Sequence, residues 1–326
     1  MDRRHEKVYK QLCKSCEDLK IKYQKTPNNK DGSENSFSFI YDKNDICSFL
    51  VKNFEIDNPN FNELFNQACS GSGQEKKKIS ILRSSSLCAL LFFNNIENVN
   101  IILNIEDKQI IFDKAFFEIK NNVISNPSNI DVVLISSKQK KILYLESKYS
   151  EYYLSCGCKN ISKSYLSNEI AKKVYNQQIL NSINFESTFD IFMNSNGEEV
   201  FKVDSNKSKR TGTKSYVEGI KQMVSHYIGV DNIFKTNIYE KDERNKILFD
   251  LIQNEAYEVY LGEILFDFED EEIHQYLVDY EEKYSHLREI LSPINTKIHM
   301  LKNPLYYSEL KEYVNPKIKY FYFGEK

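Results

Sequence analysis

The sequence predicts an α/β fold in which a central mixed β-sheet is flanked by helices and preceded by an N-terminal helical portion. Apolar residues at helical spacing dominate the first part of the chain, β-branched and aromatic runs follow, and helical and strand-like segments then alternate. With 326 residues and 41% hydrophobic content, the chain is long enough to bury a full core. We expect the helical portion over residues 1–83 and the α/β domain, with a C-terminal extension, over residues 84–326.

The first predicted elements are helices. Residues 4–23 carry apolar side chains at helical spacing among many charges, and residues 46–51 and 61–69 form two shorter apolar segments. Serines at 84–86 precede the apolar stretch 87–94 and predict a capped, buried helix, because serine hydroxyls accept hydrogen bonds from the free N–H groups at a helix start.

The central sheet is predicted to begin after these helices. Residues 110–119 are rich in β-branched and aromatic side chains and predict a strand. Residues 131–135 and 142–149 are joined by the polar turn 136–141, and this pattern predicts a β-hairpin.

The remaining segments alternate between helix and strand. Helices are expected over residues 161–181, 216–228 and 271–291, of which 216–228 shows the clearest apolar stripe. Strands are expected over residues 256–268 and 317–323.

Charge and cysteine content restrict the partners and the compartment. The net charge of −3 gives no overall indication of a nucleic-acid partner. Seven cysteines is an odd number, and the charged residues 1–10 are not followed by an apolar stretch of signal-peptide length. We therefore expect a cytoplasmic protein with reduced thiols and no membrane span.

Two carboxylates and a lysine form the chemically most informative pattern. Alternation along the strand 142–149 places Glu146 and Lys148 on one face. If the hairpin folds about residues 138–139, Asp131 lies across from Glu146, where opposed Cβ atoms are roughly 5 Å apart. Two carboxylates at that separation can share a divalent ion, and hard oxygen ligands suit Mg²⁺. This arrangement suits hydrolysis of a phosphodiester, in which the ion polarises the scissile phosphate and Lys148 can orient the attacking water or stabilise the developing charge.

An acidic residue and two short motifs resemble those of the PD-(D/E)XK nuclease superfamily, in particular bacterial restriction-endonuclease-like proteins: Glu118, Ser128-Asn129-Ile130-Asp131 and Leu145-Glu146-Ser147-Lys148. In that superfamily the aspartate opens one central strand, the Glu-x-Lys lies in the next, and an earlier acidic residue often supports the metal. Ile130 stands where the name motif has proline, a position that varies within the superfamily. The resemblance covers roughly residues 116–230.

This resemblance implies a restriction-endonuclease-like fold and a Mg²⁺-dependent DNA endonuclease, with Mn²⁺ able to replace Mg²⁺. It implies that Asp131, Glu146 and Glu118 hold the metal and that Asp131, Glu146 and Lys148 are catalytic. Gln222 on the amphipathic helix resembles a glutamine that several branches use to position the substrate or the attacking water. Restriction or another anti-phage defence is the implied role, and cutting of both strands would favour a homodimer.

Two basic segments are candidates for contacts with the DNA backbone. Residues 76–78 form one, and Lys207, Lys209 and Arg210 form the other. The second is the stronger candidate because it lies shortly before the helix that carries Gln222. The alternative is that both are solvated loop charges.

Cysteine pairs suggest an alternative metal site. Cys13 and Cys16 form a C-x-x-C pair, and Cys156 and Cys158 form a C-x-C pair, which together offer four thiolates to a structural zinc ion. The pairs lie far apart in the sequence, so free cysteines are the simpler interpretation.

A histidine and three tyrosines lie near the predicted site. His226 follows Gln222 by one turn and can approach the site to contact phosphate, although a histidine bonded within a helix interface is the simpler interpretation. Tyr149, Tyr152 and Tyr153 follow the Glu-x-Lys strand and can either stack on a base or pack in the core, of which packing is the simpler.

Two other functions stay open from the sequence. One is a non-catalytic DNA-binding or interaction protein of the same fold, and the other is a repair or recombination nuclease acting on branched DNA or RNA. The motifs of P-loop, dinucleotide-binding and α/β-hydrolase proteins are absent from the sequence.

Overall fold

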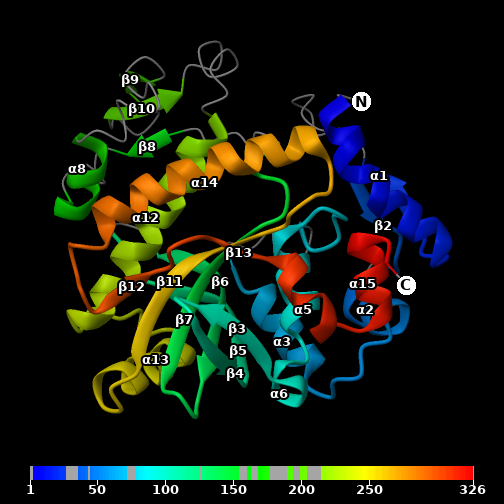
Figure 1. Cartoon of the computed structure of the whole chain (residues 1–326), viewed down its shortest axis with the longest axis horizontal. Coiled ribbons are helices and arrows are strands. Elements are labelled where there is room, and N and C mark those ends of the chain that lie inside the picture. The colour runs from blue at the N-terminus through cyan, green and yellow to red at the C-terminus, as the bar shows by residue number, and fades with distance from the viewer. Residues whose placement is uncertain are drawn as a thin grey trace.

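The computed structural model of the chain is drawn in Figure 1. It describes residues 3–26, 36–42, 45–71, 78–124, 127–153, 160–162, 168–176, 189–193, 199–203 and 214–325.

A six-stranded mixed sheet lies at the centre, in the order β12-β11-β7-β6-β5 with β13 paired to β11. Its strands are β5 (Lys114–Asn121), β6 (Ser128–Ser136), β7 (Lys141–Lys148), β11 (Glu258–Leu265), β12 (Ile298–Met300) and β13 (Leu305–Tyr306). The pairs β5–β6 and β6–β7 are antiparallel, whereas β11 is parallel to β7, β12 and β13. The predicted hairpin is confirmed as β6 and β7, and the predicted mixed sheet flanked by helices is confirmed.

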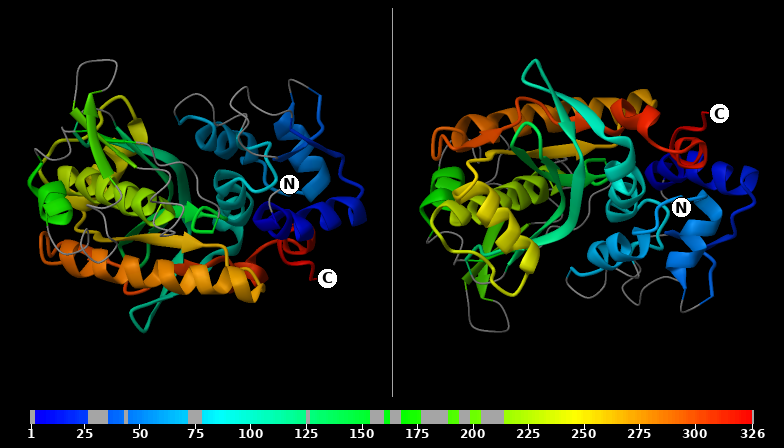
Figure 2. Two further views of the ribbon diagram at one scale, coloured as in Figure 1. Left: turned by 90° about the horizontal axis from the view of Figure 1, so that it is seen from above. Right: turned by 90° about the horizontal axis from the view of Figure 1, so that it is seen from below.

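Two hydrophobic clusters cover the two faces of this sheet. Helices on the first face are α8 (Glu169–Asn176), α12 (Lys214–Phe234), α13 (Glu243–Gln253) and the later half of α14 (Glu271–Leu291). Helices that build the cluster on the second face are α1 (Arg3–Asp18), α2 (Ile46–Phe54), α3 (Phe61–Ala68), α5 (Ser85–Phe93), α6 (Ile96–Val99), the 3₁₀ helix η1 (Tyr307–Tyr313) and α15 (Pro316–Phe323). Figure 2 shows α1 and α15 gathered at the end of the molecule opposite α8.

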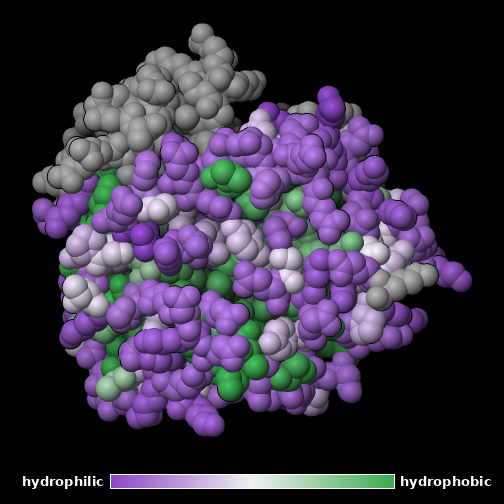
Figure 3. Space-filling view, viewed as in Figure 1, coloured by the Kyte–Doolittle hydropathy of each residue, from purple (hydrophilic) through white to green (hydrophobic). Residues whose placement is uncertain are grey.

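Smaller sheets complete the described structure. They are β1 (Tyr23–Lys25) with β2 (Phe37–Phe39), β3 (Ile101–Ile105) with β4 (Lys108–Phe112), and β8 (Asn160–Ser162) with β10 (Glu199–Val203) and β9 (Phe189–Met193). Figure 3 shows that hydrophilic residues cover most of one face of the molecule, with hydrophobic residues visible in small patches between them. No helix in the described ranges is both long enough and apolar enough to cross a membrane.

The predicted strand over residues 317–323 is wrong, because this segment forms helix α15. Asn315 caps the helix by accepting the backbone N–H groups of Lys317 and Ile318, and Pro316 occupies the first turn, where its missing N–H costs nothing. The buried residues are Ile318, Phe321 and Tyr322, whose spacing is helical.

Two other predicted elements need correction. The strand predicted over residues 110–119 is divided at Asp113 into β4 and β5, which belong to different sheets. Asp113 accepts hydrogen bonds from the backbone N–H and the hydroxyl of Ser137, which fixes it at this corner. The helix predicted over residues 161–181 is wrong at its start, where β8 pairs with β10, and α8 accounts for its described middle part.

The C-terminal helix packs with the N-terminal helices rather than with the sheet alone. Ser15 of α1 donates a hydrogen bond to the backbone carbonyl of Tyr320 in α15, and Asn315 donates to the carbonyl of Phe54 in α2. The expected boundary between residues 83 and 84 stays a prediction, but residues from both sides of it share this second-face core.

Candidate active site

Four neighbouring strands bring four carboxylates to one row of the central sheet. They are Glu118 on β5, Asp131 on β6, Glu146 on β7 and Glu263 on β11. The strand pairs that fix this row are Phe117 with Val132, Ile119 with Ile130, Val132 with Leu145, and Glu263 with Glu146. Residues in one row of a sheet are neighbours, so residues far apart in the sequence meet here.

Alternation along β7 gives Glu146 and Lys148 their common face. Tyr144, two residues earlier, belongs to the cluster under α12, whereas Leu143 and Leu145 belong to the cluster on the other face. The Lys148 Nζ atom lies 2.6 Å from Glu146 Oε1, and the two residues are only 4% and 3% exposed. Burying either charge alone would be costly, so the pair explains how both are kept in the sheet.

Helix α12 covers this ion pair and adds two polar groups to it. Gln222 accepts a hydrogen bond from Lys148 Nζ at 2.5 Å through Oε1 and donates through Nε2 to Glu146 Oε1 at 2.9 Å. His226, one helical turn later, places its Nε2 atom 2.7 Å from Glu146 Oε2. The structure therefore brings Gln222 to the predicted site, and His226 contacts a carboxylate there.

A glycine allows α12 to lie close to the sheet. Gly229 faces Asn121 at the end of β5, and a Cβ atom at position 229 would lie 2.8 Å from the Asn121 Cβ atom. Real Cβ atoms do not approach so closely, so a larger residue would push the helix away. The short contacts of Gln222 and His226 depend on this close packing.

Asp131 is held by the next strand and remains partly exposed. The backbone N–H of Ser147 donates to its Oδ2 atom at 2.8 Å. Burial, together with the negative charges of Glu146 and Glu118, raises the pKa of Asp131 well above its ordinary value, against the opposing effect of Lys148. A cation bound nearby would favour the ionised form of Asp131.

Glu146 has the opposite electrostatic character. Burial opposes its ionisation, but Lys148 and His226 outweigh burial and lower the pKa of Glu146 to about 2. The pKa of Lys148 is raised despite its burial, because Glu146 and other carboxylates surround it. Glu146 is thus a permanent carboxylate and Lys148 a permanent ammonium near neutral pH.

Glu118 sits at a distortion of β5. Its φ angle is 50°, in the left-handed region that non-glycine residues seldom adopt. Arg244 of α13 donates hydrogen bonds to the backbone carbonyls of Phe117 and Glu118 at 2.6 and 3.3 Å, and so holds this irregular backbone. The Glu118 residue is buried and lies near enough to influence the charge of Asp131.

The donor set fits a magnesium ion with few protein ligands. Within the described ranges, no three His, Cys, Asp or Glu side chains are arranged to enclose a metal ion. Mg²⁺ commonly takes only one or two carboxylates and fills its shell with water and phosphate oxygens. Asp131 and Glu146 meet that requirement, and a bound cation would oppose the rise in the pKa of Asp131 that burial and the charges of Glu146 and Glu118 cause.

Several sequence-based candidates lie outside the described residues or away from the site. Lys207, Lys209, Arg210, Cys156 and Cys158 are not among the described residues, so the DNA-contact loop and the four-cysteine zinc site stay predictions.

Other candidates from the sequence lie among the described residues and are buried in the second-face core. Cys16 on α1 is buried in the second-face core, where burial raises the pKa of its thiol. Tyr149, Tyr152 and Tyr153 are buried in the same core, which confirms core packing rather than an exposed stacking platform.

Glu263 is a fully buried member of the row that was not predicted from the sequence. Its Oε1 atom lies 2.9 Å from the Tyr280 hydroxyl, and its Oε2 atom has no hydrogen-bond partner among the described residues. Burial raises the pKa of Glu263 to about 8, Lys148 and Tyr280 oppose that rise, and Glu146 adds to it. An acidic residue inside the apolar run 259–266 was the available indication, as it was for Glu146.

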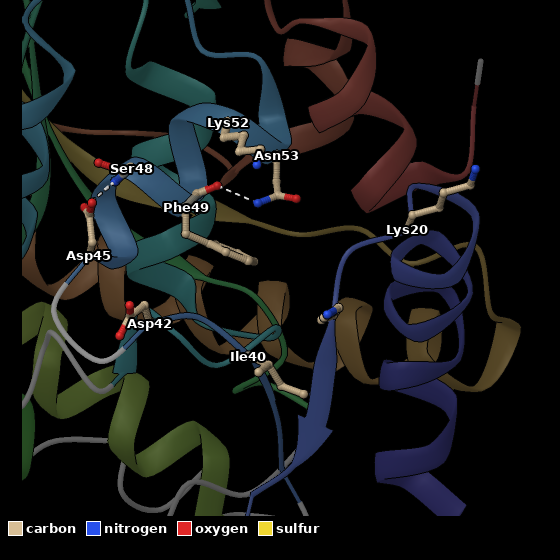
Figure 4. Close-up of a pocket in the computed structure, with 9 residues that line it drawn as sticks. Lys20, Ile40, Asp42, Asp45, Ser48, Phe49, Lys52 and Asn53 are labelled. Atoms are coloured by element: carbon tan, nitrogen blue, oxygen red, sulfur yellow. Dashed lines mark hydrogen bonds between the residues drawn. The ribbon is translucent and has the colours of Figure 1, made fainter.

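An open pocket elsewhere on the described surface is lined by charges of both signs, but by none of the four carboxylates of the row. The pocket in Figure 4, of about 370 Å³, is lined by residues of the N-terminal portion, including Asp42, Phe49 and Lys52. Its drawn hydrogen bonds join Asp45 to Ser48 and Asn53 to the Phe49 carbonyl, which are contacts within and at the start of α2.

The site thus combines paired carboxylates, a buried ammonium and a helix that supplies an amide and an imidazole. Such a set can bind a divalent cation and stabilise negative charge that develops on a phosphate. Comparison of the chain with protein-family models, with curated proteins and with solved structures found no match.

Proposed function

We propose that this chain is a Mg²⁺-dependent endodeoxyribonuclease that hydrolyses phosphodiester bonds. The observation that supports it most strongly is the contact of Lys148 with both Glu146 and Gln222, beside Asp131 in the neighbouring strand. Carboxylates and a lysine in adjacent strands suit phosphodiester hydrolysis, and a structural ion pair would not need the additional carboxylates of Asp131 and Glu118.

Asp131 and Glu146 would hold the cation, and Glu118 would add negative charge behind them. Glu146 needs no deprotonation for this role, because its pKa lies near 2. When bound, Mg²⁺ would polarise the scissile phosphate and lower the pKa of a water molecule. Mn²⁺ has similar ligand preferences and would replace it.

Lys148 would act on the nucleophilic water or on the phosphate oxygens. Among the described residues, its ammonium donates to Glu146 and Gln222, which leaves a third N–H for a ligand. Gln222 would keep the ammonium pointed toward the site, since its amide bonds both partners of the ion pair. The preorganised charge then needs no rearrangement when the substrate binds.

The biological assignment rests on the resemblance of the motifs to restriction-endonuclease-like proteins. It supports an enzyme of restriction or another anti-phage defence, acting on DNA as a homodimer when both strands are cut. The odd number of cysteines supports a cytoplasmic location. Lys207, Lys209 and Arg210 precede α12 in the chain and would contact the DNA backbone.

Cleavage assays with matched variants test the proposal. Supercoiled plasmid, linear duplex, single-stranded and branched DNA, and RNA would be incubated with the protein in Mg²⁺, Mn²⁺ or EDTA. We expect metal-dependent cutting of DNA that falls by about 100-fold or more in Asp131→Asn and Lys148→Ala. Lys141→Ala is the matched control, because Lys141 lies on the same strand but pairs with Glu258 at its other end.

Each contrary result has a definite meaning. Cutting that survives EDTA, or that persists in both site variants, would contradict the proposed mechanism. Preference for branched DNA or RNA would favour the repair or recombination nuclease. Absence of cutting together with absence of Mn²⁺ binding in calorimetry would favour a non-catalytic DNA-binding protein of the same fold.

A further inference from the structure

A chain of hydrogen bonds leads from the start of β6 through α12 to the central carboxylate. The Ser128 hydroxyl lies 2.7 Å from His226 Nδ1, and His226 Nε2 lies 2.7 Å from Glu146 Oε2. His226 is only 2% exposed, so both ring nitrogens have protein partners and the imidazole is fixed between them.

The direction of these bonds follows from the charge of Glu146. An ionised carboxylate can only accept hydrogen bonds, so His226 Nε2 carries a hydrogen atom and donates a hydrogen bond to Oε2. The Ser128 hydroxyl bonds Nδ1 on the opposite side of the ring, and a hydroxyl can serve there as donor or as acceptor. Ser128 therefore holds the imidazole in the orientation in which Nε2 faces Glu146.

The two oxygens of Glu146 are occupied unequally. Oε1 accepts from both Lys148 and Gln222, which uses both of its lone pairs. Among the described residues, Oε2 accepts from His226 alone, which leaves one lone pair for a ligand. A cation can bind that lone pair while all three hydrogen bonds to the carboxylate persist.

We propose that His226, held by Ser128, is a positioning residue that fixes the Glu146 carboxylate so that Oε2 can bind the divalent cation. This inference rests on the proposed metal-dependent function. Histidine is not itself a ligand here. It acts on the metal through Glu146, as residues that orient a ligand commonly do, and their removal typically weakens metal affinity by about 10- to 100-fold.

Two substitutions of His226 separate its two hydrogen bonds. The amide of Gln in His226→Gln reaches the place of Nε2 and can still donate to Glu146. The shorter amide in His226→Asn reaches the place of Nδ1 and can bond only Ser128. A merely structural histidine would give no reason for the two variants to differ in metal affinity.

Mn²⁺ binding, measured by calorimetry on the full chain, tests the inference. We expect the affinity to fall by about 10- to 100-fold in His226→Ala and in His226→Asn, and to recover to within a few-fold of wild type in His226→Gln. Ser128→Ala should weaken binding in the wild-type background but add little to His226→Ala, because the two residues act in one chain. His274→Ala, which removes an exposed histidine of α14, is the control and should bind as wild type.

The outcomes distinguish this inference from the proposed function. Wild-type Mn²⁺ affinity in His226→Ala, or equal losses in the Gln and Asn variants, would overturn the role of His226 and leave the metal site standing. Failure of the wild-type protein to bind Mn²⁺ would overturn both. Thermal melts in EDTA would show whether each variant is folded, and if His226→Ala is not, Ser128→Ala and the Gln and Asn pair decide the question.

Discussion

Replacing Glu263 by Gln should stabilise the protein at alkaline pH and not at acidic pH. Glu263 is fully buried on β11, and burial raises its pKa from the ordinary 4.5 to about 8. The folded state therefore holds this proton more tightly than the unfolded chain does. The resulting contribution to stability is fully present below pH 4.5 and is lost as the pH rises through about 8.

The size of the effect follows from these two pKa values. Between about pH 5 and pH 8 the unfolded chain releases the proton while the folded protein largely retains it, at 1.36 kcal/mol for each pH unit. This one group should lower the free energy of unfolding by roughly 3 kcal/mol over that interval. Gln does not titrate, and its amide oxygen can still accept a hydrogen bond from the Tyr280 hydroxyl.

Urea unfolding at both pH values, in EDTA, measures the difference between wild type and Glu263→Gln. We expect the variant to gain roughly 3 kcal/mol relative to wild type at pH 8 compared with pH 5. Glu258→Gln on the same strand is the control, because its hydrogen bond from Lys141 lowers the pKa of Glu258 and its difference should not change over this interval. A stability difference for Glu263→Gln that is the same at both pH values would refute the reasoning.

Two further perturbations test the metal site and the corrected C-terminal helix. In EDTA near neutral pH, Asp131→Asn should raise the free energy of unfolding, because burial and the charges of Glu146 and Glu118 disfavour ionised Asp131. Mn²⁺ at about 100 times its Kd should stabilise the wild type by about 2.7 kcal/mol in thermal melts and leave Asp131→Asn unchanged, and equal stabilisation of both would argue against Asp131 as a ligand. Asn315→Ala should cost about 1–2 kcal/mol in urea unfolding, since it removes both the cap of α15 and the hydrogen bond to the Phe54 carbonyl. Asn60→Ala is the control and should cost clearly less, because Asn60 makes no side-chain cap bond at the start of α3. Equal losses of stability in the two variants would contradict the stabilising role of the Asn315 side chain.

The sequence predicted those parts of the fold that depend on local patterns. The β6–β7 hairpin and the contact between Glu146 and Lys148 follow from alternation and a polar turn, so they were accessible without a structure. The strand predicted over residues 317–323 is wrong because the aromatic residues of this segment favour strands, whereas its Asn315-Pro316 start specifies a helix.

Other parts of the site depend on tertiary register. Glu263 lies more than 100 residues after Glu146 in the chain, and only the parallel pairing of β11 with β7 makes them neighbours. Helical spacing placed His226 near Gln222, but it did not indicate that Glu146 and Ser128 are its partners. Burial and pKa shifts likewise arise only when distant segments meet.

The packing of α15 on α1 has a consequence for synthesis of the protein. The hydrogen bond from Ser15 to Tyr320 spans 305 residues, and α1 cannot complete its buried face until residue 320 has left the ribosome. At about 5–20 residues per second, this delay amounts to about 15–60 s. During that time the apolar side of α1 is open to chaperones and to other nascent chains, so this helix depends on protection while the protein is being made.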